Sequence, residues 1–589
     1  MNKFNLFYFL TFLLSFSSAY LFGQISYKPV KLSNEEKSIL QESLKPMHPK
    51  YDSAYKMLTY TLNGYNYHTD AVAGEFHHVR SSFTYAVMLL DLGDKQYRQR
   101  AFDVIDKTIS LQDQDTASKS CGVWPYYLEE PLATKKSPID FNWADFNAVS
   151  LLDVWMGHNK EIPAYLKPRI KNALILAAKS IEKRNMGPGY TNIAIMGTYV
   201  TYMVSHLFNL PEMQSYARKR LQTFFDYTIE KGGFSEYNSP TYTIVALDEL
   251  YRMKLHIKEP SAKKQVDSLY SIGWEMIARH YHKPTAQWTG PHSRSYSTLV
   301  RPSFYAILKE ASGGKIITGL EEKRPDVKIK HTIPAHLMPY FLNPVYPRTE
   351  KDIFEKDEPQ TRGTSYMTSQ YALSTANRSS LWNQRRPFLL YWGTPQMPKY
   401  LQIRFLHDNY DFSSATFFSD QRENKVLAGI NFITTGGDKH ITIDRLKEGT
   451  FIAKDLRLRF ELGNVPNIDN VVLPQPGSGA INLQMDGLSF EINLFRAEIQ
   501  DMDGYWVKGG DGTNSWLDFV FYSGQEKAID LTKLSKALMA LTFVVNSQEK
   551  VEKTERPNFE EKNGLLNASW EGLFLSLPIV PVAVKNVFI

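Results

Sequence analysis

The chain has 589 residues, of which 43% are hydrophobic and 22% charged, which is ordinary for a globular protein of roughly two to four domains. Its net charge of +6 is spread over a chain with 62 acidic residues, so nucleic acid is not expected as a partner, and an anionic substrate fits somewhat better. Aromatic residues make up 13% of the chain, which suits either a large aromatic core or faces that stack on sugar rings.

The N-terminus has the pattern of a signal peptide. Lys3 precedes a nearly unbroken apolar run from Phe4 to Phe16, and small residues follow at 17–19. The run is short for a membrane span and no later stretch is apolar for long enough, so no membrane insertion is expected. The only cysteine, Cys121, offers no disulfide framework, and none stands where a lipoprotein would be cut. We therefore expect residues 1–23 to be removed and the protein to be periplasmic or secreted.

Residues 24–315 are predicted to form a helical domain. Apolar residues recur at helical spacing, several segments are apolar on more than one face, and short turns between them favour antiparallel neighbours. No repeat of fixed period is visible, so an incomplete α/α toroid is favoured over a regular solenoid. The predicted helices start at Asn34 and then cover residues 76–92, 98–111, 143–155, 164–183, 193–208, 213–231, 242–254, 262–281 and 302–310.

The sequence pattern changes near residue 313. Gly313-Gly314 ends the last predicted helix, and residues 316–360, rich in proline and charge, are predicted to be a linker. Residues 361–589 alternate polar and apolar side chains in short runs separated by glycine-rich turns, which predicts an antiparallel β-sandwich. The expected fold class is therefore multidomain α and β, with an incomplete α/α toroid followed by the sandwich.

No P-loop, dinucleotide fingerprint, zinc-protease motif or nucleophile elbow occurs in the context that it requires. The sequence also has no ligand pattern for a metal and calls for no cofactor. What remains is a set of polar residues in the helical half.

Three segments hold these polar residues. Asn192 stands at a helix start, where a helix cap is the simpler alternative. The segment 232–242 joins two predicted helices, and the segment 288–296 has His, Arg and Tyr at alternate positions, which would project to one side of an extended chain. The candidates in these last two segments are Glu236, Tyr237, Asn238, Tyr242, His292, Arg294 and Tyr296.

These residue types suit the cleavage of a uronic-acid polysaccharide by β-elimination. The sugar carboxylate must be neutralised while enolate-like charge develops, and Asn, His or Arg can do so. A tyrosine can serve as base and as acid if a nearby cation lowers its pKa from about 10. A glycoside hydrolase would instead need two carboxylates across the scissile bond, which Glu236, Asp140 and Asp145 can supply, so hydrolysis stays open. A non-catalytic glycan-binding protein is the third reading.

The sequence resembles the heparinase II/III-like and chondroitin-AC-like polysaccharide lyases. The resemblance is carried by Gly-Gly-Phe-Ser-Glu-Tyr-Asn-Ser-Pro-Thr-Tyr at 232–242, by residues 364–373 and by Trp-Asn-Gln-Arg-Arg-Pro-Phe at 382–388. It implies a toroid followed by a β-sandwich, a uronate-containing polysaccharide as substrate and cleavage without a cofactor. Among subgroups, the L-rhamnose–α-1,4-D-glucuronate lyases are the most similar in size, layout and export.

The resemblance also implies roles for individual residues. Asn192 matches the asparagine that neutralises the carboxylate, and Tyr242 is the first choice for the catalytic tyrosine, with Tyr296 and Tyr237 as alternatives. The usual histidine of the family is missing near Tyr237, so His292 is the candidate for its role. Implied substrate contacts, for which core packing is an open alternative at the tryptophans, are Arg294, Asn238, Glu236, His77, His78, Trp124 and Trp143.

Overall fold

The computed structural model describes residues 25–584 except 65, 67, 358, 438–442, 445, 476–479 and 548–553. The predicted signal peptide, residues 1–23, lies outside the described residues. The chain forms two compact units, which we call the helical unit and the sheet unit. The helical unit holds residues up to Ile229, Val245–Ile272 and Lys323–His331; the sheet unit holds Glu230–Ile244, Gly273–Glu322 and Thr332–Ile589.

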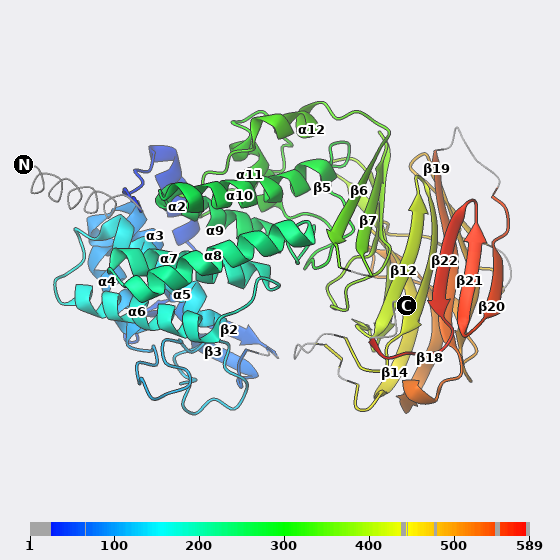
Figure 1. The fold of residues 1–589 in the computed structure, drawn as a ribbon, viewed down its shortest axis with the longest axis horizontal. Helices are drawn as coiled ribbons and strands as arrows, with labels where there is room; N and C mark the ends of the chain where they lie inside the picture. The colour runs from blue at the N-terminus through cyan, green and yellow to red at the C-terminus, as the bar shows by residue number, and fades with distance from the viewer. Residues whose placement is uncertain are drawn as a thin grey trace, which may run out of the picture. The chain divides into compact units, whose positions relative to one another are not determined.

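The helical unit is built from successive helical hairpins and forms the predicted incomplete α/α toroid (Figure 1). Local signals set the ends of its helices. Ser33 and Glu36 form a capping box at the start of the first helix, and Gly93 ends the second in a left-handed conformation with φ 75°. The helices are α2 (Asn34–Leu44), α3 (Val79–Leu92), α4 (Lys95–Ile109), α5 (Asn142–His158), α6 (Leu166–Arg184), α7 (Thr191–Leu207), α8 (Pro211–Lys231), α9 (Tyr242–His256) and α10 (Pro260–His280). Among the described residues, none of the helices is long and apolar enough to cross a membrane.

A small antiparallel sheet precedes α3, and the sequence did not predict it. Its strands are β1 (Tyr51–Asp52), β2 (Met57–Asn63) and β3 (Ala73–His77). The helix predicted over 76–92 therefore begins at Val79, because Phe76 and His77 pair with β2 as the end of β3. The alternation in β2 and β3 is weak because exposed residues occur in runs in both strands, so no strand pattern stood out.

The sheet unit contains three stacked antiparallel layers. The nine-stranded sheet has the order β17-β18-β14-β10-β9-β8-β7-β6, with β11 paired to β10; the second sheet has the order β12-β13-β19-β16-β15; the third has β20-β21-β22. The strands of the first sheet are β6 (Arg348–Glu355), β7 (Thr361–Met367), β8 (Tyr371–Ala376), β9 (Phe388–Gly393), β10 (Pro398–His407), β11 (Tyr410–Asp411), β14 (Thr450–Gly463), β17 (Tyr505–Gly510) and β18 (Ser515–Asp530). Those of the other two are β12 (Ala415–Arg422), β13 (Lys425–Phe432), β15 (Ile481–Met485), β16 (Leu488–Ile499), β19 (Ala537–Ser547), β20 (Asn558–Lys562), β21 (Leu565–Trp570) and β22 (Leu573–Pro578).

Two apolar cores hold these layers together. Leu390, Phe460 and other buried side chains of the nine-stranded sheet pack against Phe543 and its neighbours on the second sheet. The opposite face of the second sheet packs on the third through residues such as Leu427 and Trp570. The predicted β-sandwich is therefore confirmed, with a third sheet added to it.

The predicted linker, residues 316–360, is structured, which corrects its assignment. It contains η2 (Ala335–Leu337), α12 (Met338–Leu342) and strand β6. Lys323–His331 belongs to the helical unit, where Lys328 Nζ lies 2.8 Å from Asp91. The inward face of β6 carries the charged residues Arg348, Glu350 and Asp352, which hid its alternation in the sequence.

Part of the predicted toroid belongs instead to the sheet unit. This part includes β4 (Tyr281–His282), β5 (Gln287–Trp288) and α11 (Pro302–Ala311), within Gly273–Glu322. Gly290 approaches the side chain of Leu389 so closely that an added Cβ would stand 2.9 Å from it, and Gly290 O accepts a hydrogen bond from Ser365 Oγ at 2.7 Å. The segment thus packs on the nine-stranded sheet, and it carries the predicted candidates at 288–296.

Candidate active site

Three segments of the sheet unit meet at one place: residues 232–242 between α8 and α9, residues 288–296, and residues 382–386 between β8 and β9. Backbone hydrogen bonds join them. His292 and Arg386 exchange two such bonds at 3.0 and 2.8 Å, as neighbouring antiparallel strands do, and Ser293 N donates to Tyr237 O at 3.3 Å. The side chains on these segments are therefore positioned by a fixed backbone.

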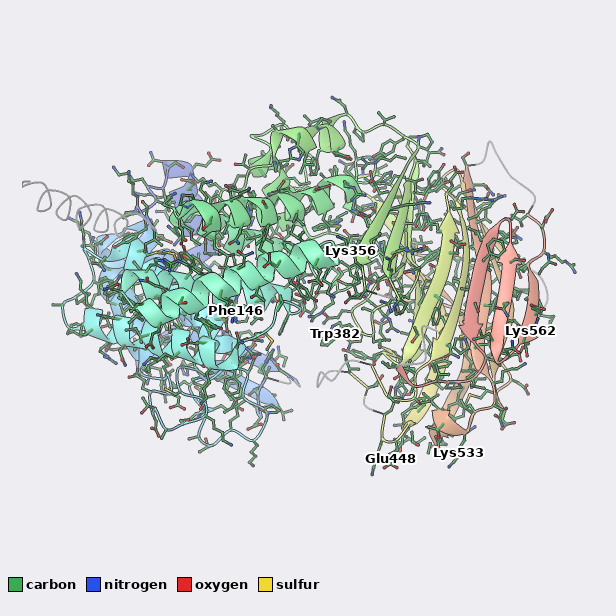
Figure 2. The ribbon with its side chains drawn as sticks, in the orientation of Figure 1. Phe146, Lys356, Trp382, Glu448, Lys533 and Lys562 are labelled. Atoms are coloured by element: carbon green, nitrogen blue, oxygen red, sulfur yellow. The ribbon has the colours of Figure 1, made fainter. Side chains whose placement is uncertain are left out.

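Arg294 lies at the centre of this place and binds two predicted candidates. Its Nη1 lies 2.7 Å from Glu236 Oε1, and its Nη2 donates to Tyr242 Oη at 2.8 Å. Tyr242 Oη and Tyr296 Oη are 2.7 Å apart, within hydrogen-bond distance. The guanidinium carbon also lies 4.2 Å from the ring centroid of Trp382, which is labelled in Figure 2. Arg294, Glu236 and the two tyrosines form what we call the tyrosine–arginine cluster.

The two tyrosine hydroxyls of this cluster have different surroundings. Burial raises the pKa of Tyr242 well above its ordinary value, and the Arg294 cation acts in the opposite direction. Tyr242 is 8% exposed, whereas Tyr296 is 51% exposed. Burial outweighs the cation, so Tyr242 is protonated in the free protein; Arg294 is the group that opposes this effect, and Tyr296 is the hydroxyl that solvent reaches.

Beneath the cluster, Asn238 fixes the loop. It has a left-handed backbone conformation with φ 43°, and its Nδ2 donates to the carbonyls of Thr289 and Pro291 at 2.9 Å each. Its Oδ1 accepts a hydrogen bond from Trp288 Nε1 at 2.5 Å. Both polar atoms of the Asn238 side chain therefore form hydrogen bonds within the protein. Because the residue is also buried, its predicted role as a substrate contact has no support from the structure.

His292 has a similar supporting position. Its Nδ1 donates to Asn238 O at 2.5 Å, and only 1% of the residue is exposed. Burial lowers the pKa of His292 to about 3, so the imidazole is neutral at ordinary pH. The predicted alternation at 292, 294 and 296 does not bring three side chains to one accessible surface, because His292 turns into the core while Tyr296 is exposed.

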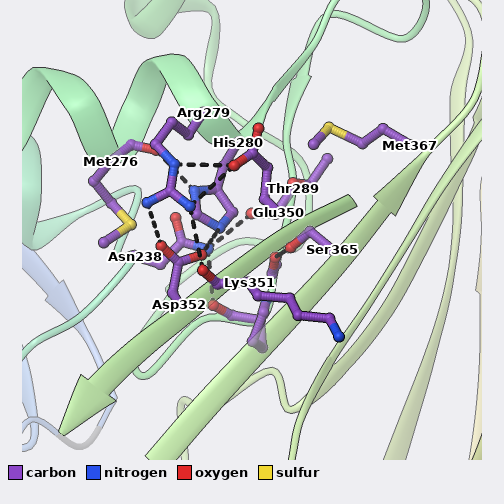
Figure 3. A network of polar contacts seen from close by, with 12 residues as sticks. Asn238, Met276, Arg279, His280, Thr289, Glu350, Lys351, Asp352, Ser365 and Met367 are labelled. Carbon is purple, nitrogen blue, oxygen red and sulfur yellow. Dashed lines mark hydrogen bonds and ion pairs between the residues drawn. The ribbon is translucent and has the colours of Figure 1, made fainter. Parts of the chain in front are cut away.

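A buried ionic network lies next to Asn238 (Figure 3). Asp352 on β6 is 2.5 Å from Arg279 Nη1 and 3.2 Å from His280 Nε2, and Arg279 Nε donates to Glu350 at 3.0 Å. Burial opposes the ionisation of Asp352, but His280 and Arg279 hold its pKa below its ordinary value. Thr289 N donates to His280 O at 2.8 Å and Thr289 O accepts from Asn238, so the network connects to the loop.

Tyr237 is the third tyrosine that the sequence singled out. Its ring stacks on Phe354 of β6, with centroids 4.1 Å apart and planes 7° apart, and burial raises its pKa above its ordinary value. It is 4% exposed, so it supports the loop from below.

The remaining predicted site residues lie in the helical unit. Asn192 is the second residue of α7 and is buried. His77 Nδ1 donates to Glu129 Oε1 at 2.5 Å, and His78 caps α3 by accepting a hydrogen bond from Ser81 N at 3.1 Å. The roles of all three in substrate binding stay predictions.

The two predicted aromatic platforms differ in their surroundings. Trp124 is 1% exposed and donates from Nε1 to Thr108 O at 3.0 Å, which is the position of a core residue. Trp143 is 5% exposed, and its ring lies 5.5 Å from that of His78 and 4.5 Å from that of Tyr126, centroid to centroid. Core packing therefore accounts for both rings, and their predicted role as sugar platforms has no support from exposure.

Two contributors were not assigned a role from the sequence. Gln384 Oε1 accepts hydrogen bonds from Arg294 at 3.3 and 3.4 Å, and Trp382 covers the guanidinium. Both lie in the Trp-Asn-Gln-Arg-Arg motif at 382–386. This motif carries the resemblance, but the sequence does not indicate what each of its residues does. Within the described ranges, no group of three or more His, Cys, Asp or Glu side chains is arranged to hold a metal ion.

Comparisons with known proteins give a family match and similar folds. Residues 37–326 match the family model described as a domain of unknown function, DUF8769. No curated protein sequence matches the chain. A heparinase III structure is similar at 10% identity over 94% of this chain and 92% of that chain, with a TM-score of 0.48. A chondroitin AC lyase from Streptomyces coelicolor A3, in complex with chondroitin sulphate, is similar at 10% identity over 92% and 86%, with a TM-score of 0.45. At these identities the similarities concern the fold alone.

Proposed function

We propose that the protein is an exported polysaccharide lyase that cleaves the bond to a uronic acid by β-elimination. The observation that carries the proposal is the contact of the Arg294 cation with Tyr242, whose hydroxyl lies 2.7 Å from that of Tyr296. A tyrosine next to a cation is the base that this reaction needs, because the C5 proton of a uronate is only weakly acidic.

The two tyrosines divide the proton transfers. Tyr242, as phenolate, accepts hydrogen bonds from Arg294 and from Tyr296, so the negative charge is best stabilised there. The base takes the C5 proton, the C4–O4 bond breaks, a C4–C5 double bond forms, and O4 leaves with a proton. Tyr296, the exposed partner, passes protons between Tyr242 and the leaving oxygen or solvent.

The state of the carboxylates disfavours hydrolysis. Glu236 is buried and lies 2.7 Å from Arg294, so its carboxylate orients the cation. Asp140 lies 3.1 Å from His68, and Asp145 is 2% exposed, with its pKa raised to about 7 by burial. A hydrolase needs one carboxyl as acid and another as base or nucleophile at the same sugar, and none of these three is free for that work.

The finer assignment follows the resemblance in sequence. We infer glucuronate as the acidic sugar and a rhamnose–glucuronate linkage as the first candidate bond, with Asn192 neutralising the carboxylate. The signal-peptide pattern supports a periplasmic or secreted enzyme.

The test is to incubate the purified protein with a panel of glucuronate-containing glycans and to follow ultraviolet absorbance and product mass. A lyase gives products with a conjugated double bond at their new non-reducing end, so absorbance rises with cleavage. Shorter products that have gained water and lack new absorbance would establish hydrolysis instead. Tight glycan binding without any product would favour a non-catalytic binding protein.

A further inference from the structure

The N-terminal ends of α3 and α5 lie together in the helical unit. The ring of His78, the N-cap of α3, is 5.5 Å from that of Trp143, the second residue of α5. Since backbone N–H groups at helix starts carry partial positive charge, this end favours an anion.

Arg80, the second residue of α3, adds a full positive charge at this end. Its guanidinium carbon lies 3.9 Å from the ring centroid of Phe146, which is labelled in Figure 2. Within the described part of the chain, no carboxylate lies within ion-pair distance of Arg80. Glu249, whose charge raises the pKa of Arg80, is itself paired with Arg252 at 3.0 Å. The cation is therefore without an internal counter-ion among these residues.

Arg80 is enclosed and yet accessible. Burial lowers the pKa of its guanidinium, so protein atoms displace much of its water. Its side chain nevertheless keeps solvent access, because the residue is exposed. A cation that is partly desolvated but still reachable gains more from an incoming anion than a fully hydrated surface arginine does.

Aromatic rings stand beside this cation. Tyr126 lies 4.5 Å from Trp143 and 4.8 Å from His78, the N-cap of α3, centroid to centroid. Tyr60 on β2 lies 5.7 Å from His78 and is 45% exposed. Such rings offer apolar faces to a sugar, and a guanidinium binds a carboxylate through two parallel hydrogen bonds.

We propose that Arg80, together with Tyr60, Tyr126 and Phe146, forms a binding subsite for the carboxylate-bearing sugar of an acidic glycan. We call it the helix-start subsite. Arg80 pairs with the carboxylate while the rings hold the sugar. The proposal rests on the proposed function only for the class of glycan, since charge and aromatic surroundings define the subsite without reference to catalysis.

The experiment measures binding, with turnover suppressed by Tyr242→Phe in the full chain. The probes are glucuronate-bearing oligosaccharides from gum arabic and the same oligosaccharides after reduction of the carboxylate to an alcohol, titrated by calorimetry. Arg80→Met keeps the alkyl packing on Phe146 and removes the charge. We expect it to weaken binding of the acidic probe about tenfold or more and to leave the reduced probe unchanged.

Arg100→Met is the matched control. Arg100 also stacks on a tyrosine, Tyr51, at 4.5 Å, but it lies on α4 and donates to Tyr85 Oη at 3.2 Å, so its loss should leave both probes unaffected. Equal weakening of both probes by Arg80→Met, or no weakening of either, would overturn the subsite. So would failure of the starting protein to prefer the acidic probe.

The outcomes separate this inference from the proposed function. If the binding pattern holds but the unmodified chain produces no unsaturated product from any glycan, the lyase proposal fails and the subsite stands. If the chain cleaves the acidic glycan but Arg80→Met leaves its binding unchanged, the subsite fails alone.

Discussion

Tyr242 and Tyr296 are joined by a short contact, but only Tyr242 also contacts a cation. Arg294 donates to Tyr242 Oη at 2.8 Å, so Tyr242→Phe removes the hydroxyl that the cation contacts. Tyr242→Phe should therefore lower kcat by about 10³-fold or more, and Tyr296→Phe by a smaller factor of about 10²-fold, as general acid–base groups do. Initial rates by ultraviolet absorbance on the glycan identified in the panel would measure both.

The control for this pair is Tyr410→Phe. Tyr410 is 49% exposed and accepts a hydrogen bond from Asn383 at 2.9 Å, so its loss removes a similar hydroxyl outside the cluster. Its rate should stay near that of the unmodified chain. Full activity of Tyr242→Phe would show that Tyr242 is not the base.

His292 predicts a defined pH dependence of stability. Burial lowers its pKa from 6.5 to about 3, so its contribution to stability is complete above pH 6.5 and is lost as the pH falls toward 3, because only the unfolded chain takes up the proton. His292→Gln removes this dependence. The difference in unfolding free energy between the two proteins should shrink by about 1.4 kcal/mol for each pH unit as the pH falls from 6.5 toward 3.

Urea unfolding of both proteins at about pH 8 and about pH 5 measures this difference. His407→Gln serves as a control, because the pKa of His407 is raised by Asp444 and by the carbonyl of Ile452 against the effect of burial. Its stabilising contribution therefore changes with the opposite sign. A constant difference for His292→Gln across the range would contradict the buried neutral histidine.

At the residue scale, the sequence predicted the members of the cluster better than their division of labour. Glu236, Tyr242, Arg294 and Tyr296 were all candidates, and they do contact one another. The turn of His292 into the core was not predictable, because it depends on pairing with Arg386, far away in the sequence.

At the scale of elements, the loop 232–242 depends on Asn238. Asn238→Ala removes three side-chain hydrogen bonds and places alanine at φ 43°, whereas Asn238→Gly removes the same bonds without the backbone cost. We expect both to lower the free energy of unfolding by about 2–4 kcal/mol, with alanine worse than glycine by about 1 kcal/mol. Chemical unfolding of the two variants gives both values.

A control for the loop prediction is Asn209, which also has a positive φ of 52° but follows α7 in the helical unit. Asn209→Gly should change stability little. If Asn238→Gly proves as mild as this control, then the hydrogen bonds of Asn238 do not hold the loop.

Elements with strong local signals were the ones predicted. Helices α5 to α9 follow from apolar spacing, and Tyr242 begins α9 as expected. Strands β1 to β3 and β6 were missed, since their pairing lies with partners that a local pattern does not indicate. In these segments, pairing with other strands determined the secondary structure more than local sequence preference did.

At the scale of the whole molecule, the two compact units are not consecutive stretches of sequence. Residues 230–244 and 273–322 belong with the strands, while 323–331 belongs with the helices. Composition changes at residue 313, but the boundary of a unit is set by burial, and burial is not visible in composition. The predicted division at residues 315 and 361 therefore separates segments that fold together.

This interleaving predicts how fragments behave. A fragment of residues 361–589 lacks β6 and the segment that covers Leu389, Tyr391 and Tyr400, which are all buried in the intact chain. Exposing each of these side chains costs roughly 1.5–3 kcal/mol, and β7 becomes an open edge. We expect this fragment to aggregate and to bind a hydrophobic dye. A fragment of residues 273–589 keeps both the cover and the edge strand, so it should stay monomeric and unfold cooperatively. Sedimentation and dye fluorescence compare the two, and a monomeric, cooperative 361–589 fragment would show that the cover is dispensable for the sheets.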